Sequence, residues 1–164
     1  MRERRSPSRR LKSGEPVDIL LDSHIHGKIS WLLSKILPQI ESGGKKRLTE
    51  EIKFKRIVGE TSCVCTTDGD EIAYAQRPGR KGLTRFVKNR EAELSDSAVI
   101  ILRKGGRGNY ILVTLFVGVL GHPEPWDKRA NKASYQYWLN HALVWGTEPI
   151  VPGTETSECP WGAR

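Results

Sequence analysis

Four histidines are the side chains of this sequence best suited to proton transfer: His24, His26, His122 and His141. Imidazole titrates close to neutral pH, so a histidine placed over a cleft is a competent general base or general acid. His24 and His26 stand two residues apart, a spacing that also occurs in metal sites, but no suitable group of acids and further histidines follows them. The alternative to a catalytic role is that each histidine is only a hydrogen-bonded surface or boundary residue. The pattern favours acid–base chemistry without a metal or another cofactor.

Basic residues gather in two stretches of the chain, which carries a net charge of +8. Residues 1–13 hold six basic residues against one acid, as nonspecific anion-binding tails often do. Residues 77–107 hold nine basic residues against three acids. An excess of this kind suits a phosphate-bearing partner such as RNA, and it also occurs on faces that only keep a protein soluble. The predicted substrate-binding residues are Arg77, Arg80, Lys81, Lys88, Arg103, Lys104 and Arg107, with Trp126 either stacked on a base or closing the core.

Several functional classes are disfavoured by motifs that the sequence lacks. Cys63, Cys65 and Cys159 form neither a disulfide framework nor a metal motif, so we interpret the first two as small strand residues. The nucleotide-binding patterns GxGxxG and GxxxxGK[ST] do not occur, which argues against nucleotide-dependent transfer. No apolar run approaches the roughly 18 residues of a membrane span, and no signal-peptide core follows the basic start. We expect a soluble, cytoplasmic protein without a membrane partner.

Hydrophobic periodicity predicts the elements that must position these residues. Three- and four-residue apolar steps in 25–40 predict an amphipathic helix, capped by Asp22 or Ser23 and ended by Pro38. Alternation in 51–58 and 61–67 predicts strands, and a turn at 68–70 predicts a hairpin into 71–75. Residues 98–103 and 110–119 predict two apolar strands joined by a glycine-rich hairpin. A second helix is predicted over 132–143, with one face formed by Tyr135, Trp138, Leu139 and Ala142.

This order of elements predicts an α+β protein, because alternating βαβ units are absent. The expected architecture is an N-terminal helix packed on an antiparallel sheet of about four or five strands, with an additional C-terminal helix. We expect a disordered basic tail over residues 1–13, a single α+β domain over 14–146, and an irregular C-terminal segment over 147–164.

Short motifs within residues 22–120 resemble those of the barnase–EndoU–colicin–RelE group of small ribonucleases. The motifs are a helical segment bearing histidine, the triplet Arg85-Phe86-Val87, Ser97 before an apolar strand, and Thr114-Leu115-Phe116 in the strand after a hairpin. Many members of this group are toxins of toxin–antitoxin or contact-dependent systems. The C-terminal extension with its second helix is not part of the group's minimal fold.

The resemblance implies a metal-independent endoribonuclease that acts as a toxin. It would make His24 or His26 the base and Arg85 the phosphate anchor, with Ser97 and Thr114 positioning the scissile group. Arginine suits the phosphate because its planar fork meets two oxygens at once. His141 would supply the acid for the leaving 5′-oxygen if the second helix folds back. The expected partners are RNA and an acidic antitoxin. A non-catalytic nucleic-acid-binding accessory protein and a small-molecule enzyme remain the alternatives.

Overall fold

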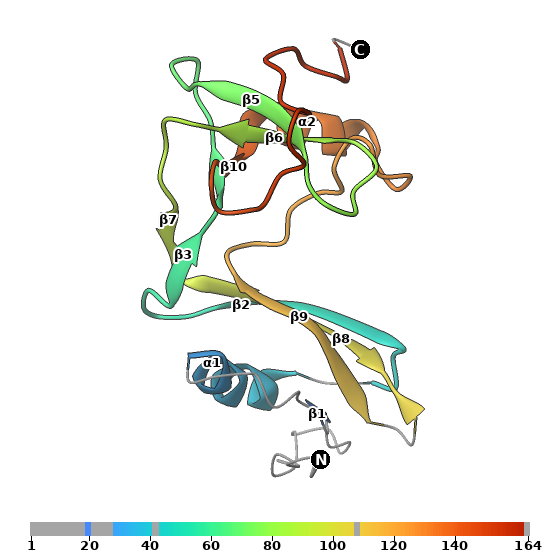
Figure 1. Cartoon of the computed structure of the whole chain (residues 1–164). Helices are drawn as coiled ribbons and strands as arrows, with labels where there is room; N and C mark the ends of the chain where they lie inside the picture. Colours follow the sequence, from blue (N-terminus) through green and yellow to red (C-terminus); the bar gives the residue numbers. More distant parts are fainter. Residues whose placement is uncertain (1–18, 21–27, 41–42, 107–108, 163–164) are drawn as a thin grey trace. The chain divides into compact units, whose positions relative to one another are not determined.

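The computed structural model describes residues 19–20, 28–40, 43–106 and 109–162 of the chain, and it has the predicted α+β composition (Figure 1). The chain divides into two compact units. The first unit comprises Met1–Val58 and Asp96–Val119, and the second comprises Gly59–Ser95 and Leu120–Arg164. The sequence predicted a single domain over 14–146. The predicted tail and the capping residues Asp22 and Ser23 lie outside the described residues.

The helix of the first unit has the predicted amphipathic pattern. It consists of α1 (Lys28–Ile36), followed by the 3-10 turn η1 (Leu37–Gln39), which contains Pro38. Proline has no amide hydrogen with which to continue an α-helix, which explains why the regular helix stops here. Buried residues of this segment pack against strand residues in one cluster. In Figure 1, α1 lies beside the strands of this unit's sheet. The buried residues are Leu32, Leu33, Ile36 and Ile40.

The sheet of the first unit has the strand order β1-β9-β8-β2. Its central hairpin, β8 (Ser97–Lys104) with β9 (Tyr110–Val117), confirms the two predicted apolar strands. The strand predicted over 51–58 is β2 (Arg47–Lys53), which starts earlier because it pairs antiparallel with β8 along its whole length. The short strand β1 (Ile19–Leu20) runs parallel to β9. The buried face of this sheet, including Leu48, Ile100 and Leu102, completes the core around α1.

The second unit contains a four-stranded sheet with the order β4-β10-β6-β5. These strands are β4 (Cys63–Cys65), β5 (Ile72–Gln76), β6 (Leu83–Val87) and β10 (His141–Val144). The predicted hairpin between 61–67 and 71–75 is wrong, because β10 and β6 lie between β4 and β5. Residues 61–67 are also divided, since β3 (Gly59–Thr61) pairs separately with β7 (Glu93–Ser95).

The prediction of one antiparallel sheet is therefore wrong as well. The described strands form three sheets, and two of the pairings, β1 with β9 and β10 with β6, are parallel. Parallel neighbours are joined through long connections, which local alternation of polar and apolar residues does not report.

The helix of the second unit, α2 (Lys132–Asn140), begins with a capping box. The side chain of Asn131 accepts from the Ser134 amide at 3.2 Å, and the Ser134 hydroxyl accepts from the Asn131 amide at 3.1 Å. The predicted helix was three residues too long, because β10 begins at His141. Its predicted apolar face is wrong in part, since Leu139 is 52% exposed.

The C-terminal segment after Trp145 is irregular, as expected, and an isolated bridge ties Thr156 to Tyr74 of β5. Neither α1 nor α2, the helices of the described part of the chain, is long and apolar enough to cross a membrane.

Candidate active site

His141 stands where α2 gives way to β10, and its ring is held from two directions. Its Nδ1 lies 2.9 Å from the Tyr137 carbonyl oxygen, and its ring stacks on the Tyr137 ring with centroids 3.9 Å apart and planes within 4°. A carbonyl oxygen only accepts hydrogen bonds, so Nδ1 carries the proton and Nε2 is the basic nitrogen of the neutral ring. The side chain is half-buried. His141 thus has a defined tautomer and ring orientation.

Tyr137 gathers two further groups around itself. The His122 ring lies 4.9 Å from the Tyr137 ring, and the Tyr137 hydroxyl lies 3.6 Å from the Cys63 sulfur. Burial raises the pKa of the Cys63 thiol, the hydrogen bond with Tyr137 lowers it, and Glu124 raises it. The thiol therefore stays protonated near neutral pH. The structure thus places two histidines of the second unit on one tyrosine.

Sequence reasoning missed Tyr137 and gave no role to His122. The available signal was the four-residue spacing of Tyr137 and His141, which stacks side chains along one face of a helix. His122 offered no comparable local signal, because its approach to Tyr137 depends on the loop before α2. That loop is held by a hydrogen bond of 2.9 Å from the Trp138 indole nitrogen to the His122 carbonyl.

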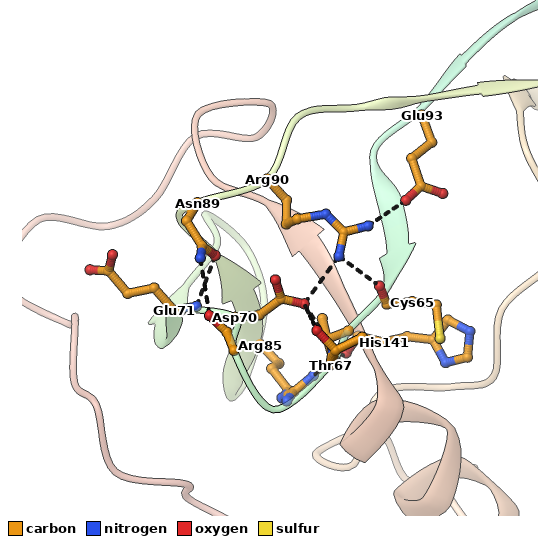
Figure 2. Close-up of polar contacts among 11 residues, drawn as sticks. Cys65, Thr67, Asp70, Glu71, Arg85, Asn89, Arg90, Glu93 and His141 are labelled. Carbon is orange, nitrogen blue, oxygen red and sulfur yellow. Dashed lines mark hydrogen bonds and ion pairs between the residues drawn. The ribbon is translucent and has the colours of Figure 1, made fainter.

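Arg85 lies directly beside the start of β10. It is only 9% exposed, so it is not a surface cation. Its Nη1 donates to the Thr66 hydroxyl at 2.8 Å and to the His141 carbonyl at 3.0 Å (Figure 2). It also faces Tyr74 across β5 and β6. Burial raises the pKa of Tyr74 and the hydrogen bond with Cys159 raises it further, while Arg85 counteracts both. Nη1 of Arg85 therefore donates within the protein and fixes the backbone of His141, while the buried Nε of Arg85 has no hydrogen-bond partner among the described residues.

The turn that contains Thr66 is held by a second arginine. The carboxylate of Asp70 accepts from the Thr67 amide at 2.7 Å and from Arg90 at 3.1 Å. Arg90 also donates to Glu93 at 2.6 Å and to the Cys65 carbonyl at 3.4 Å, as Figure 2 shows. Because these bonds hold the turn, the Thr66 hydroxyl is in place to accept the hydrogen bond from Arg85.

The remaining predicted catalytic residues lie elsewhere. Ser97 is a buried residue at the start of β8, where its hydroxyl donates to Asp96 at 3.1 Å. Thr114 pairs with Ile101, four positions along β8 from Ser97, which corresponds to about 13 Å. The two residues are therefore not brought together, and both belong to the first unit, whereas Arg85 and His141 belong to the second. His24 and His26 lie outside the described residues.

The predicted substrate-binding cations separate into two groups. Two form ion pairs in the second unit: Arg77 with Glu124 and Glu148, and Lys88 with Glu155. Four others are exposed: Arg80 and Lys81 in the loop before β6, and Arg103 and Lys104 at the end of β8. Arg107 lies outside the described residues.

Trp126 forms part of the wall of a pocket of about 650 Å³ in the second unit. Tyr135, Trp161, Pro125 and Pro160 also line it. Trp126 packs so closely on Gly82 that a β-carbon added there would lie 2.3 Å from the Trp126 Cβ. The tryptophan is thus half-buried in a pocket wall. Its exposure lies between that of a residue closing the core and that of a residue fully displayed to stack on a base.

Within the described residues, no group of three or more histidine, cysteine, aspartate or glutamate side chains is placed to hold a metal ion. The site contains His141 in a fixed orientation, His122 against the same tyrosine, and the buried Arg85, which donates to the His141 carbonyl. Comparison of the chain with protein-family models, with curated proteins and with solved structures found no match.

Proposed function

We propose that this protein is a metal-independent endoribonuclease in which His141 transfers one of the two protons of the reaction. The observation that carries the proposal is the fixed tautomer of His141, whose Nδ1 donates to the Tyr137 carbonyl at 2.9 Å and leaves Nε2 as the basic atom. A base with a defined tautomer is what proton abstraction from a ribose hydroxyl requires. The motifs that resemble small ribonucleases point to the same chemistry.

The proposed reaction balances with two proton-transfer groups. One group removes the proton of the 2′-hydroxyl while its oxygen attacks phosphorus, and the other gives a proton to the 5′-oxygen as the P–O5′ bond breaks. The products are a 2′,3′-cyclic phosphate and a 5′-hydroxyl. We propose His141 and His122 as the two groups, because both contact the ring of Tyr137.

Arg85 has a positioning role in this proposal. Its guanidinium is buried and donates to the His141 carbonyl and to Thr66. The phosphate-anchoring role that the resemblance implies for Arg85 is better suited to exposed cations. We further propose that the protein acts as a toxin, for which an acidic antitoxin is the matching partner. Growth arrest on expression, lost with His141→Ala, is the expected cellular result.

The test is incubation of the purified full chain with total RNA in excess EDTA. We expect cleavage that survives EDTA and leaves cyclic phosphate ends. His141→Ala should lower the rate by roughly 10²- to 10⁴-fold, the usual contribution of one acid–base group. Asn140→Ala, at the exposed neighbouring position, is the matched control and should cleave normally.

Two Tyr137 variants test the positioning of His141. Tyr137→Phe retains the stacked ring and should remain active, whereas Tyr137→Ala removes the ring beneath His141 and should lower the rate. RNA that stays intact with the unmodified protein, but shifts on a gel equally with His141→Ala, would overturn the catalytic proposal. That result would favour the nucleic-acid-binding accessory protein.

A further inference from the structure

The pairing of β2 with β8 gathers five cations at one end of the first unit's sheet. Arg47, the first residue of β2, lies opposite Arg103 of β8. Next to this pair, the Lys104 amide donates to the Lys46 carbonyl at 2.7 Å. The five-cation cluster consists of Lys45, Lys46, Arg47, Arg103 and Lys104, and all five residues are exposed. Only the strand register unites them, because more than fifty residues separate the two groups along the chain.

The backbone beneath the five-cation cluster is held firmly by the core. The hydroxyl of Tyr110, a residue only 2% exposed, donates to the Lys45 carbonyl at 2.7 Å. Leu48 follows Arg47 and Leu102 precedes Arg103. Both leucines are buried, with exposed fractions of 2% and 0%. Because side chains alternate along a strand, Arg47 and Arg103 share the face of the sheet opposite these leucines. The cations are therefore presented by a rigid support.

The arrangement is electrostatically unfavourable in the isolated protein. Like charges directly opposite each other destabilise a strand pair. The acids of β2, Glu50 and Glu51, are three and four positions beyond Arg47, at about 10 to 13 Å. That separation is comparable to the Debye length of about 8 to 10 Å in ordinary buffers, so these acids offer little compensation. A polyanion bound at the cluster would remove the repulsion.

The two units also differ strongly in charge. The first unit holds 17 basic and 8 acidic residues, whereas the second holds 10 basic and 11 acidic residues. The basic excess of the chain therefore belongs to the first unit. Sequence reasoning placed it in residues 1–13, which belong to the first unit, and in residues 77–107, several of whose cations the second unit uses in its own ion pairs.

We propose that the five-cation cluster binds the phosphodiester backbone of RNA and anchors the substrate independently of its base sequence. The inference deepens the proposed function, on which it rests for the choice of RNA as the polyanion. Arg47 and Arg103 meet phosphate oxygens through their planar forks, and the lysines act as point charges. Contacts of this kind position a nucleic acid and carry no sequence information.

The test measures the salt dependence of binding to a single-stranded oligonucleotide with 2′-O-methyl riboses, which cannot be cleaved by attack of the 2′-hydroxyl. The variant is Arg47→Gln with Arg103→Gln, and the matched control is Lys53→Gln with Lys55→Gln, exposed cations near the other end of β2. Loss of two phosphate contacts should reduce the slope of log K against log salt by about 1.4, which corresponds to roughly 20-fold weaker binding at about 0.1 M salt. The control should change the slope far less.

Thermal unfolding separates lost binding from lost folding. Removing the opposed arginines should leave the melting temperature unchanged or raise it, because the repulsion between them disappears. Should the variant unfold, Lys46→Gln with Lys104→Gln takes its place in the same titration. Equal slopes for the cluster variants and the control would overturn the proposal. So would cluster variants that lose binding to phosphatidylserine vesicles while keeping their affinity for the oligonucleotide.

Cleavage kinetics distinguish this inference from the proposed function. With an active enzyme, the Arg47→Gln, Arg103→Gln variant should raise KM for long RNA far more than it changes kcat, whereas His141→Ala should lower kcat. If the unmodified protein cleaves no RNA but this variant binds the oligonucleotide more weakly, the anchoring proposal holds and the nuclease proposal fails. If the unmodified protein cleaves RNA but this variant binds and cleaves it normally, the nuclease proposal holds and the anchoring proposal fails.

Discussion

At the scale of single residues, the three cysteines lie in different surroundings although all are free thiols. Cys65 and Cys159 are exposed, whereas Cys63 is half-buried beside Tyr137. Burial raises the pKa of the Cys63 thiol, so at any given pH a smaller fraction of it is the reactive thiolate.

We predict that Cys63 is the slowest of the three cysteines to react with iodoacetamide at about pH 8, because its raised pKa and its burial both oppose alkylation. Peptide mass spectrometry over time gives the three rates, and denaturant should make them equal. Since its folded pKa lies above the unfolded value, Cys63 contributes stability that is present below the unfolded pKa and lost as pH rises through the folded one. Equal rates in the native protein would contradict the prediction.

Glu124 is the second residue whose surroundings allow a firm prediction. It is 9% exposed and accepts hydrogen bonds from Arg77 and from Thr84. Glu124→Ala leaves the Arg77 charge without its main partner, so unfolding should become easier by about 3 kcal/mol. Urea denaturation measures the change. Arg129→Ala is the control, because Arg129 is 70% exposed in its ion pair with Asp127, and it should leave the midpoint nearly unchanged.

At the scale of elements, α2 is held by its N-terminal cap and by its few buried side chains. The helix has only nine residues, and Ser134 and Trp138 are its buried ones. Helices of this length are marginal in isolation, so capping and packing must hold them in place. The position of α2 matters for the site, because Tyr137 lies in this helix and His141 is the first residue after it.

Asn131→Ala should destabilise the protein by about 1 kcal/mol, because it removes the acceptor of the Ser134 amide. Asn131→Asp retains the acceptor oxygen and is the matched control. Circular dichroism during thermal unfolding measures both variants. A melting temperature that falls equally in the two would show that the lost stability does not come from the cap.

The elements also show where local sequence information was sufficient. The helix over 25–40 and the strands over 98–103 and 110–119 have strong periodicity and long apolar runs, and the structure contains them in its described part as α1, β8 and β9. The error at residues 141–143 has a local cause, because a helix and a strand meet there without an intervening loop. Periodicity alone rarely places such a boundary within a few residues.

At the scale of the whole molecule, the two units have separate hydrophobic clusters. The cluster around α1 consists of residues of the first unit, and the clusters around Val64 and Phe86 consist of residues of the second. Because no residue is shared among these clusters, a core substitution in one unit removes contacts from that unit alone.

Ile36→Ala should therefore destabilise the first unit by about 3 kcal/mol and speed amide hydrogen exchange in β2, β8 and β9, with little change in β6 and β10. Phe86→Ala, at a fully buried position of the second unit, should give the reverse pattern. Mass-spectrometric hydrogen exchange reads out both variants. Equal acceleration in all five strands would show that the two units unfold together.

The amino-acid sequence alone determined the α+β composition, the amphipathic helix, the apolar hairpin and the residue types suited to acid–base and phosphate chemistry. These properties depend on neighbours within a few positions, where side-chain period and turn chemistry act. Only the tertiary structure decided which chemical groups meet. The insertion of β10 between β4 and β6 brings His141 to Arg85, and the register of β2 with β8 brings Arg47 to Arg103. Strand neighbours distant in sequence are selected by burial and backbone pairing over the whole fold, and no local pattern encodes that choice.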